Sequence, residues 1–334
     1  MTHSIPAMGT IVTIETLAAD ADALPRIERA FDWIRQVEAT CTRFEPDSEA
    51  MRLTARFGTP VPVSDILFEA ARFAVAVAEA SGGAFDPTVG HMLQARGFNR
   101  HYRTGEAAAS TMVPATDPTF RDVHIDAANR TITLLRPVIL DLGAIAKGLA
   151  IDLAARELAP LADFVVDAGG DLYLAGRGRG GQPWRVGIRH PRENGLLRQL
   201  TITDAAVCTS GDYERPAPDG GDGHHLVDAR TGVCARTVSS ATVVAPTAMV
   251  ADAFATAAFV LGPVDGIAFL EAQDVEGLIV SPSLEQHATR GFAATFAGPA
   301  ILRHAERPAD HPARHSRGRR RRDRRRPADR TRTG

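Results

Sequence analysis

The stretch LDLGAIAKGLAID, residues 140–152, combines three features that organise the rest of the sequence. An apolar, strand-like run leads into Asp141 and Gly143, and a helix with Asp141 as its cap is expected to run to about Leu158. The N-terminus of a helix offers unpaired N–H groups and a partial positive charge, which favour anions. Lys147 lies one to two turns into this helix and adds an ammonium group. The pattern indicates an anion site, and a surface lysine on an amphipathic helix is the alternative that it leaves open.

Lys147 is the only lysine among the 38 basic residues of the 334-residue chain. The surrounding sequence is not a phosphate-binding Walker loop, because the spacing G-x-x-x-x-G-K-[ST] is absent and Leu149 follows two residues after the lysine. An anion bound here is therefore not held in the manner of P-loop nucleotide hydrolases.

The composition is that of a globular protein with a substantial core, at 44% hydrophobic and 23% charged residues. No run of 18 apolar residues is present, so no transmembrane helix is expected. The N-terminal segment lacks the features of a signal peptide, and the three cysteines are too widely spaced for a disulfide framework. We therefore expect a cytoplasmic protein.

Charge divides the chain into two parts. From Arg303 to the C-terminal end, 13 arginines stand against four acidic residues, whereas residues 1–302 carry 25 basic and 36 acidic residues. We expect residues 1–302 to form one catalytic domain and residues 303–334 to be a disordered, arginine-rich tail, because the tail has almost no apolar side chains to bury. The negative charge of the larger part would repel a nucleic acid, so no nucleic-acid partner is expected.

Hydrophobic periodicity predicts long helices and short strands without regular βαβ alternation. The fold class is therefore predicted to be α+β, with mixed, largely antiparallel sheets and packed helices. Residues 99–119 are predicted to be a loop. The expected helices cover residues 22–40, 64–83, 141–158 and 247–262, and the expected strands cover 8–15, 123–126, 130–140 and several short segments between 163 and 211.

A second feature is the apolar helix expected within PTAMVADAFATAAFVLGP, residues 246–263. Asp252 is its only charged residue, and Thr256 follows one turn later on the same face. A carboxylate is costly to bury unless it is paired or bound to a cation, and carboxylate and hydroxyl oxygens suit Mg²⁺. The alternatives are that Asp252 faces solvent or pairs with an arginine.

A third feature is CTSGDYERPAPDGGDGHHLVDARTG, residues 208–232. His224 and His225 precede a short strand, and Asp228 lies beyond it. A histidine beside an acidic group can act as a general base, and a structural histidine is the alternative.

Seven segments occur together in the order found in one enzyme family. They are AMGT, GGAFDPTVG, LDLGAIAKGLAID, DAGGDLYLAG, TSGDYER, HHLVDARTG and MVADAFATAA. Over roughly residues 7–300, the sequence resembles the FAD:protein FMN transferases of the ApbE family.

The resemblance implies an ApbE-like fold with an FAD site in a cleft. It also implies a Mg²⁺-dependent flavin transferase that cleaves FAD, attaches FMN through a phosphoester bond to a threonine or serine of a target protein, and releases AMP. The implied partner is an acceptor protein with a D-x-x-[ST]-G-A-T-like segment. Two alternatives remain open: an FAD pyrophosphatase that yields FMN and AMP, and a non-catalytic flavin-binding protein.

The same resemblance assigns residues by motif position. It implies that the Mg²⁺ is held by the Ala144 carbonyl, Asp252 and Thr256, and that His225 is the base. It implies that FAD is contacted by Met8, Phe44, Ala84, Phe85, Asp86, Asp141, Lys147 and Leu226. The sequence departs from the common family pattern at Thr54, where relatives usually have asparagine.

Overall fold

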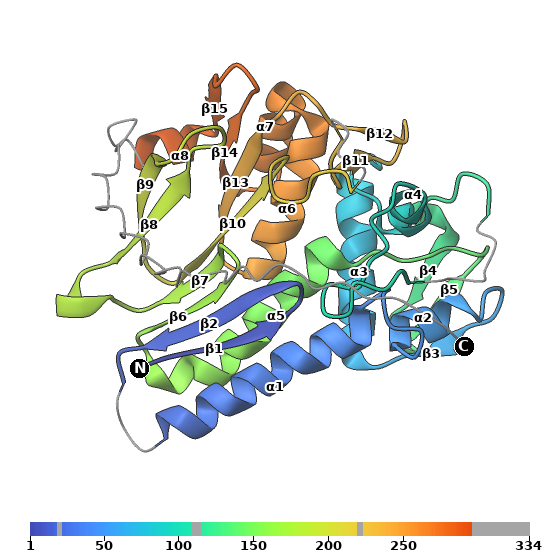
Figure 1. Cartoon of the computed structure of the whole chain (residues 1–334), viewed down its shortest axis with the longest axis horizontal. Coiled ribbons are helices and arrows are strands. Elements are labelled where there is room, and N and C mark those ends of the chain that lie inside the picture. The colour runs from blue at the N-terminus through green and yellow to red at the C-terminus, as the bar shows by residue number, and fades with distance from the viewer. Residues whose placement is uncertain (19–21, 109–114, 219–222, 296–334) are drawn as a thin grey trace, which may run out of the picture.

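The computed structural model describes residues 1–18, 22–108, 115–218 and 223–295, so the tail predicted at 303–334 lies outside the described residues. Helices pack against a sheet of eight strands whose neighbours all pair antiparallel, which confirms the α+β class (Figure 1). The strand order is β1-β2-β6-β7-β10-β13-β14-β15. These strands are β1 Thr2–Ala7, β2 Thr10–Thr16, β6 Phe164–Ala168, β7 Asp171–Ala175, β10 Ala205–Gly211, β13 Ser240–Ala245, β14 Glu276–Val280 and β15 Gln286–Ala288.

Three smaller sheets complete the strand content of the described residues. A three-stranded sheet has the order β3-β5-β4, and two hairpins pair β8 with β9 and β11 with β12. Their bounds are β3 Val61–Pro62, β4 Val123–Asp126, β5 Thr131–Leu134, β8 Trp184–Arg189, β9 Leu196–Ile202, β11 Val227–Asp228 and β12 Val233–Cys234.

The longer helices are α1 Ala23–Cys41, α3 Asp65–Ala80, α5 Gly143–Leu158, α6 Ala248–Leu261 and α7 Pro263–Ala272. Shorter helices and 3₁₀ turns lie between them: α2 Glu49–Thr54, α4 Gly90–Ala95, α8 Arg290–Thr295, η1 Pro87–Val89, η2 Phe120–Asp122, η3 Ala159–Leu161 and η4 Arg179–Gly181. No helix in the described part of the chain has both the length and the apolar character needed to cross a membrane.

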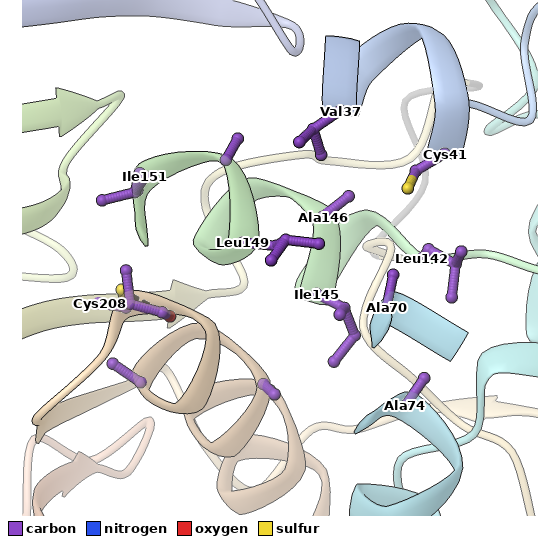
Figure 2. Packing of buried hydrophobic residues seen from close by; sticks show 14 of the residues in the cluster. Val37, Cys41, Ala70, Ala74, Leu142, Ile145, Ala146, Leu149, Ile151 and Cys208 are labelled. Carbon is purple, nitrogen blue, oxygen red and sulfur yellow. Dashed lines mark hydrogen bonds between the residues drawn. The ribbon is translucent and has the colours of Figure 1, made fainter. Parts of the chain in front are cut away.

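Helix α5 is the centre of the core, because α1, α3 and α6 all pack against it. Figure 2 shows apolar side chains of α5, among them Ile145, Ala146 and Leu149, between Val37 of α1 and Ala70 of α3. Small and branched side chains alternate along α5, so neighbouring helices approach it on several sides.

The closest of these approaches joins α5 to the N-terminus of α6 at Gly148. A β-carbon at Gly148 would lie 2.5 Å from the Met249 Cα, so only glycine fits. One turn further along α5, the Asp152 carboxylate accepts the backbone N–H groups of Ala248 and Met249 at 2.7 and 2.9 Å. The Thr247 hydroxyl caps the same helix by accepting the Val250 N–H. These contacts fix the start of α6, and with it the position of Asp252.

Three sequence predictions of local structure were wrong in detail. The strand expected at 8–15 is one arm of a hairpin: β2 begins at Thr10, and Met8 and Gly9 form a turn with φ of 54° and 77°. The strand expected over 130–140 ends at Leu134. Residue 142, rather than Asp141, occupies the cap position of α5, although the Asp141 carboxylate accepts the Gly143 N–H at 2.9 Å. In each case a backbone turn, which periodicity does not detect, sets the boundary.

The helices predicted at 22–40, 64–83, 141–158 and 247–262 are confirmed to within a few residues at their ends. Gly262 and Pro263 end α6, and Pro263 also starts α7, since proline is accepted in the first turn of a helix. The described parts of the predicted loop 99–119 contain no strand or helix.

We expect the Gly148→Ala variant to be destabilised by about 1–3 kcal/mol, because the added methyl group overlaps the backbone of α6. The free energy of unfolding in urea measures the effect. The control is Gly223→Ala, whose β-carbon would meet its nearest neighbour, the Ala217 β-carbon, at 3.4 Å. Equal stability of the Gly148 variant and the unsubstituted protein would show that the two helices are not in close contact.

Candidate active site

The partly buried Lys147 and the buried Asp171 and Asp252 form a cluster of three charges where α5, the start of β7 and α6 meet. The Lys147 ammonium is ion-paired with Asp171 and lies 4.0 Å from Asp252 Oδ1. Burial alone would lower the pKa of Lys147, but the two carboxylates outweigh it and raise the pKa above its ordinary value. Asp171, which also accepts the Thr209 N–H at 3.0 Å, was missed by sequence reasoning. Lys147 is therefore neither a surface lysine nor an unpaired cation.

Asp252 is 5% exposed, so it does not face solvent. Burial raises the pKa of Asp252 to about 7, the Lys147 ammonium opposes this shift, and the Asp171 carboxylate adds to it. The Gly148 backbone N–H is close enough to lower the pKa of Asp252, whereas Asp252 Oδ2 is buried and has no hydrogen-bond partner within the described ranges. A buried carboxylate oxygen without a partner is costly, and a bound cation would remove that cost.

The other oxygens predicted to bind metal lie on the same two helices. Thr256 follows Asp252 by one turn of α6, and its hydroxyl is 3.0 Å from the hydroxyl of Ser210 on β10. Ala144 lies in the first turn of α5, and the regular helical partner of its carbonyl is the Gly148 N–H, which is also among the groups that lower the pKa of Asp252. A carboxylate, a hydroxyl and a carbonyl are ligands that Mg²⁺ accepts, so the residues present fit this ion.

Histidine, cysteine, aspartate and glutamate do not gather in groups of three or more suited to a metal anywhere in the described ranges. A cation at Asp252 would therefore depend on backbone and hydroxyl oxygens as well as on that one carboxylate.

Asp141 lies at the N-terminus of α5 and is paired with a buried arginine. Arg43 Nε is 2.6 Å from Asp141 Oδ2, and Arg43 Nη2 donates to the Phe98 carbonyl at 2.5 Å. Burial acts to raise the pKa of Asp141, but the Arg43 charge and the hydrogen bond from the Gly143 N–H lower it overall. The Arg43 guanidinium also lies 4.3 Å from the centre of the Phe44 ring. Phe44 was selected from the sequence, whereas Arg43 was not.

His225 is half-buried, and its Nδ1 is buried without a hydrogen-bond partner in the described residues. Burial and the nearby charge of Arg215 lower the pKa of His225 to about 3, so the ring is neutral at neutral pH. The Phe98 ring lies edge-on to it at 6.4 Å between centroids. Asp228 is bound to Arg230, so it does not orient His225.

His224 and Leu226, on either side of His225, are hydrogen-bonded within the protein. His224 Nε2 lies 2.8 Å from the Ala235 carbonyl, and its Nδ1 accepts the Leu226 N–H at 3.2 Å. The Leu226 carbonyl accepts the Ala235 N–H at 3.1 Å. Both backbone groups of Leu226 therefore already have partners inside the protein.

Ala84, Phe85 and Asp86 are buried in the turn that follows α3. The Asp86 carboxylate accepts hydrogen bonds from the backbone and hydroxyl of Thr88 and from the Phe120 N–H. Burial is the main cause that raises the pKa of Asp86. Asp86 therefore supports the turn with both of its oxygens.

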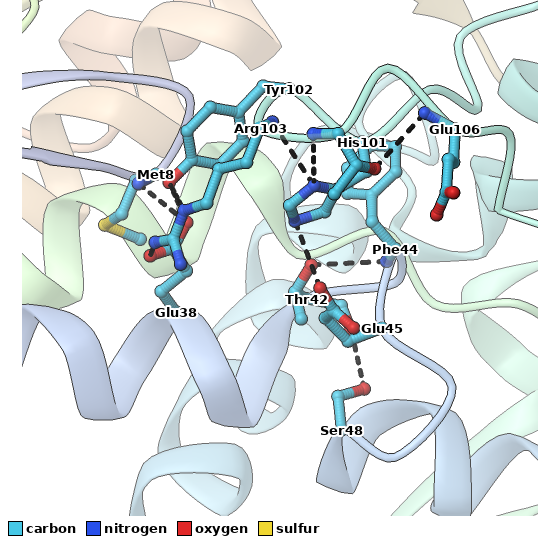
Figure 3. Close-up of polar contacts among 11 residues, drawn as sticks. Met8, Glu38, Thr42, Phe44, Glu45, Ser48, His101, Tyr102, Arg103 and Glu106 are labelled. Carbon is cyan, nitrogen blue, oxygen red and sulfur yellow. Dashed lines mark hydrogen bonds and ion pairs between the residues drawn. The ribbon is translucent and has the colours of Figure 1, made fainter.

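Met8 belongs to a separate polar network around Glu38 (Figure 3). The Met8 N–H and the Tyr102 hydroxyl donate to Glu38 Oε1 at 2.8 and 2.7 Å, and Arg103 Nη2 donates to Glu38 Oε2 at 2.6 Å. Glu38 thereby holds the Met8–Gly9 turn against the loop that carries Tyr102. Glu38 was not selected from the sequence.

The structure therefore brings most of the selected residues into three neighbouring groups. Lys147, Asp252 and Thr256 form one, and Asp141, Phe44 and His225 are linked through Arg43 and Phe98. The Met8 turn forms the third. A surface hollow of about 350 Å³ lies elsewhere, lined by Val75, Glu79, Phe120, Arg121, Val123, His124 and Leu135, and holds none of the selected groups.

Comparisons with known proteins show the family to which the chain belongs. The model of the ApbE family matches residues 8–279. The chain is 35% identical over 296 residues to the FAD:protein FMN transferase of Treponema pallidum (strain Nichols), covering 81% of each chain.

Solved structures of ApbE proteins have the same fold as this chain. The ApbE protein of Thermotoga maritima superposes with a TM-score of 0.78 at 28% identity, covering 89% of this chain and 99% of that one. The flavin transferase ApbE of Vibrio cholerae superposes with a TM-score of 0.75 at 25% identity, covering 88% and 98%.

We expect the Arg43→Gln variant to lose about 3–5 kcal/mol of folding free energy, because it leaves the largely buried Asp141 carboxylate unpaired. Urea unfolding measures the loss. The Arg43→Gln/Asp141→Asn double variant should lose less than the sum of the two single variants. Simple additivity would show that the two side chains do not interact.

The stability contribution of His225 should depend on pH. The folded protein takes up the His225 proton only near pH 3, whereas an unfolded histidine takes it up near the ordinary value of about 6.5. Acidification therefore favours the unfolded state. Relative to His225→Gln, the unsubstituted protein should lose about 1–2 kcal/mol of unfolding free energy between pH 7 and pH 5. Parallel urea titrations at the two pH values measure this, and identical pH dependence in both proteins would contradict it.

Proposed function

The chain belongs to the ApbE family and is an enzyme of the FAD:protein FMN transferase class; we propose that it uses Mg²⁺, transfers FMN to a threonine or serine hydroxyl of an acceptor protein, and releases AMP. The acceptor we propose carries a D-x-x-[ST]-G-A-T-like segment. The observation that supports this most is the buried, unpartnered Asp252 Oδ2 on an otherwise apolar helix, one turn from the Thr256 hydroxyl.

In the proposed reaction, the acceptor hydroxyl oxygen attacks the phosphorus atom of the FMN half of FAD. The new O–P bond replaces the bridging P–O bond of the diphosphate, and AMP leaves with the bridging oxygen. A hydroxyl is a weak nucleophile, so a base assists by removing its proton. We assign this role to His225, whose imidazole is neutral at neutral pH and is therefore able to accept a proton.

The Ala144 carbonyl, Asp252 and Thr256 would hold the Mg²⁺. When bound, this ion supplies positive charge that stabilises the anionic diphosphate as it breaks. Lys147 and Asp171 place a paired charge beside Asp252 and keep that carboxylate in position. The Ser210 hydroxyl, which contacts the Thr256 hydroxyl, keeps Thr256 in position.

For the flavin, we propose that the Met8 turn and Phe44 line the site while Arg43 and Asp141 fix its wall. Ala84, Phe85, Asp86 and Leu226 are buried or fully hydrogen-bonded inside the protein, so we propose that they shape the site from behind.

The test is to incubate the full chain with FAD, Mg²⁺ and an acceptor that carries the segment. A flavin-fluorescent acceptor band on a denaturing gel and an equal amount of AMP are expected. An acceptor with alanine in place of the threonine or serine should remain unlabelled. AMP without a labelled band would identify a pyrophosphatase, and neither product would contradict the proposal.

The Asp252→Ala variant should lose at least about 100-fold in AMP release, since it removes the only carboxylate among the proposed metal ligands. The matched control is Asp32→Ala, an exposed helical carboxylate paired with Arg35, which should keep full activity. Mg²⁺-dependent AMP release by a folded Asp252→Ala protein would contradict the metal assignment.

A further inference from the structure

We propose that Arg215 is a substrate-binding residue whose guanidinium binds the phosphate groups of FAD. The inference rests on the proposed function in taking a flavin dinucleotide as the substrate. Arg215 lies in the TSGDYER segment, just after β10, and was not selected as a site residue from the sequence.

The backbone of Arg215 is held beside the proposed base. Its carbonyl accepts the His225 N–H at 3.3 Å, and the next residue, Pro216, forms an isolated β-bridge with His224. The arginine and the histidine are therefore brought together by main-chain pairing between segments that are ten residues apart.

The side chain of Arg215 reaches the turn that holds Met8. Arg215 Nη2 lies 3.8 Å from the point where a β-carbon of Gly9 would stand, and the Tyr102 ring lies 3.9 Å from the same point. Gly9 has no side chain, so the space between this arginine and the aromatic ring stays open. The guanidinium therefore lies near the Met8 turn, while the Arg215 backbone lies beside the proposed base.

The charge of Arg215 acts on groups from separate elements. It is among the causes that lower the pKa of His225, of Asp141 at the start of α5 and of Asp252 on α6. A single guanidinium thus lies close to both the metal-binding group and the flavin-binding group of residues. A dinucleotide that reaches from the metal-binding residues to the flavin-binding residues would therefore place its diphosphate beside Arg215.

Arg215 also differs from the other cations of the site in lacking an ion-pair partner. Lys147 is paired with Asp171 and Arg43 with Asp141, whereas no carboxylate in residues 1–18, 22–108, 115–218 or 223–295 lies within 4.0 Å of the Arg215 guanidinium. An exposed arginine that is not neutralised can bind two phosphate oxygens through parallel N–H donors. The diphosphate of FAD is the anion that the proposed reaction brings here.

The test compares FAD and riboflavin binding by Arg215→Gln and the unsubstituted full chain, using calorimetry or fluorescence anisotropy with EDTA present to prevent turnover. Riboflavin carries the same ring system without phosphate. The variant should bind FAD about 10-fold to 100-fold more weakly, as expected for loss of a charged hydrogen-bond pair, and should bind riboflavin with unchanged affinity. The FAD affinity of Arg215→Lys should lie between those of Arg215→Gln and the unsubstituted protein, since a lysine keeps the charge and loses the paired donors.

Arg189→Gln is the matched control, because Arg189 lies over the neighbouring Tyr213 ring and pairs with Glu214. It should bind FAD as the unsubstituted protein does. Unchanged FAD affinity in Arg215→Gln, or an equal loss of FAD and riboflavin affinity, would overturn the proposal. So would absence of FAD binding to the unsubstituted protein, which would also overturn the proposed function. FAD binding without AMP release, when Mg²⁺ and the acceptor replace EDTA in a parallel incubation, would count against the proposed function alone.

Discussion

The close contact between α5 and the start of α6 is the constraint on which the rest of the site depends. It exists because position 148 is glycine and because Asp152 receives the first N–H groups of α6. Asp252 lies one turn further along α6, and the Gly148 N–H is close enough to its carboxylate to lower the pKa of Asp252. The same few residues that dock the two helices therefore also bring a carboxylate from one helix to the first turn of the other.

Around this contact, burial raises the pKa of Asp252 and the Lys147 ammonium lowers it. Asp252 and Asp171 share one ammonium, so the three groups together carry a net negative charge when both carboxylates are ionised. Asp141 has its own partner in Arg43. Lys147 and Arg43 are thus already paired with carboxylates, which is why we propose that a metal ion and Arg215 bind the anionic dinucleotide. The Lys147–Asp171 and Arg43–Asp141 ion pairs thus stabilise the fold and also hold the proposed site residues in position.

Much of the fold could be predicted from the sequence, because helices such as α1, α3 and α6 bury one face and repeat their apolar residues at that period. The Met8–Gly9 turn could not be predicted, since the positive φ of Met8 does not change the hydrophobic periodicity of the sequence. Arg43 and Asp171 were missed for another reason: they lie 98 and 24 residues from the side chains that they bind, Asp141 and Lys147. An arginine in a loop and an aspartate after two glycines look like ordinary surface residues until their partners are known.

By itself, the sequence determined the helix periods and the single carboxylate in an apolar helix, because each depends on residues within a few turns of one another. The tertiary structure alone decided that Lys147 is bound to two carboxylates, that His225 is held neutral, and that Arg215 lies beside it without an ion-pair partner among the described residues. The physical reason is that charge state and pairing follow from distance and burial. Both are set only when segments far apart in the chain come together.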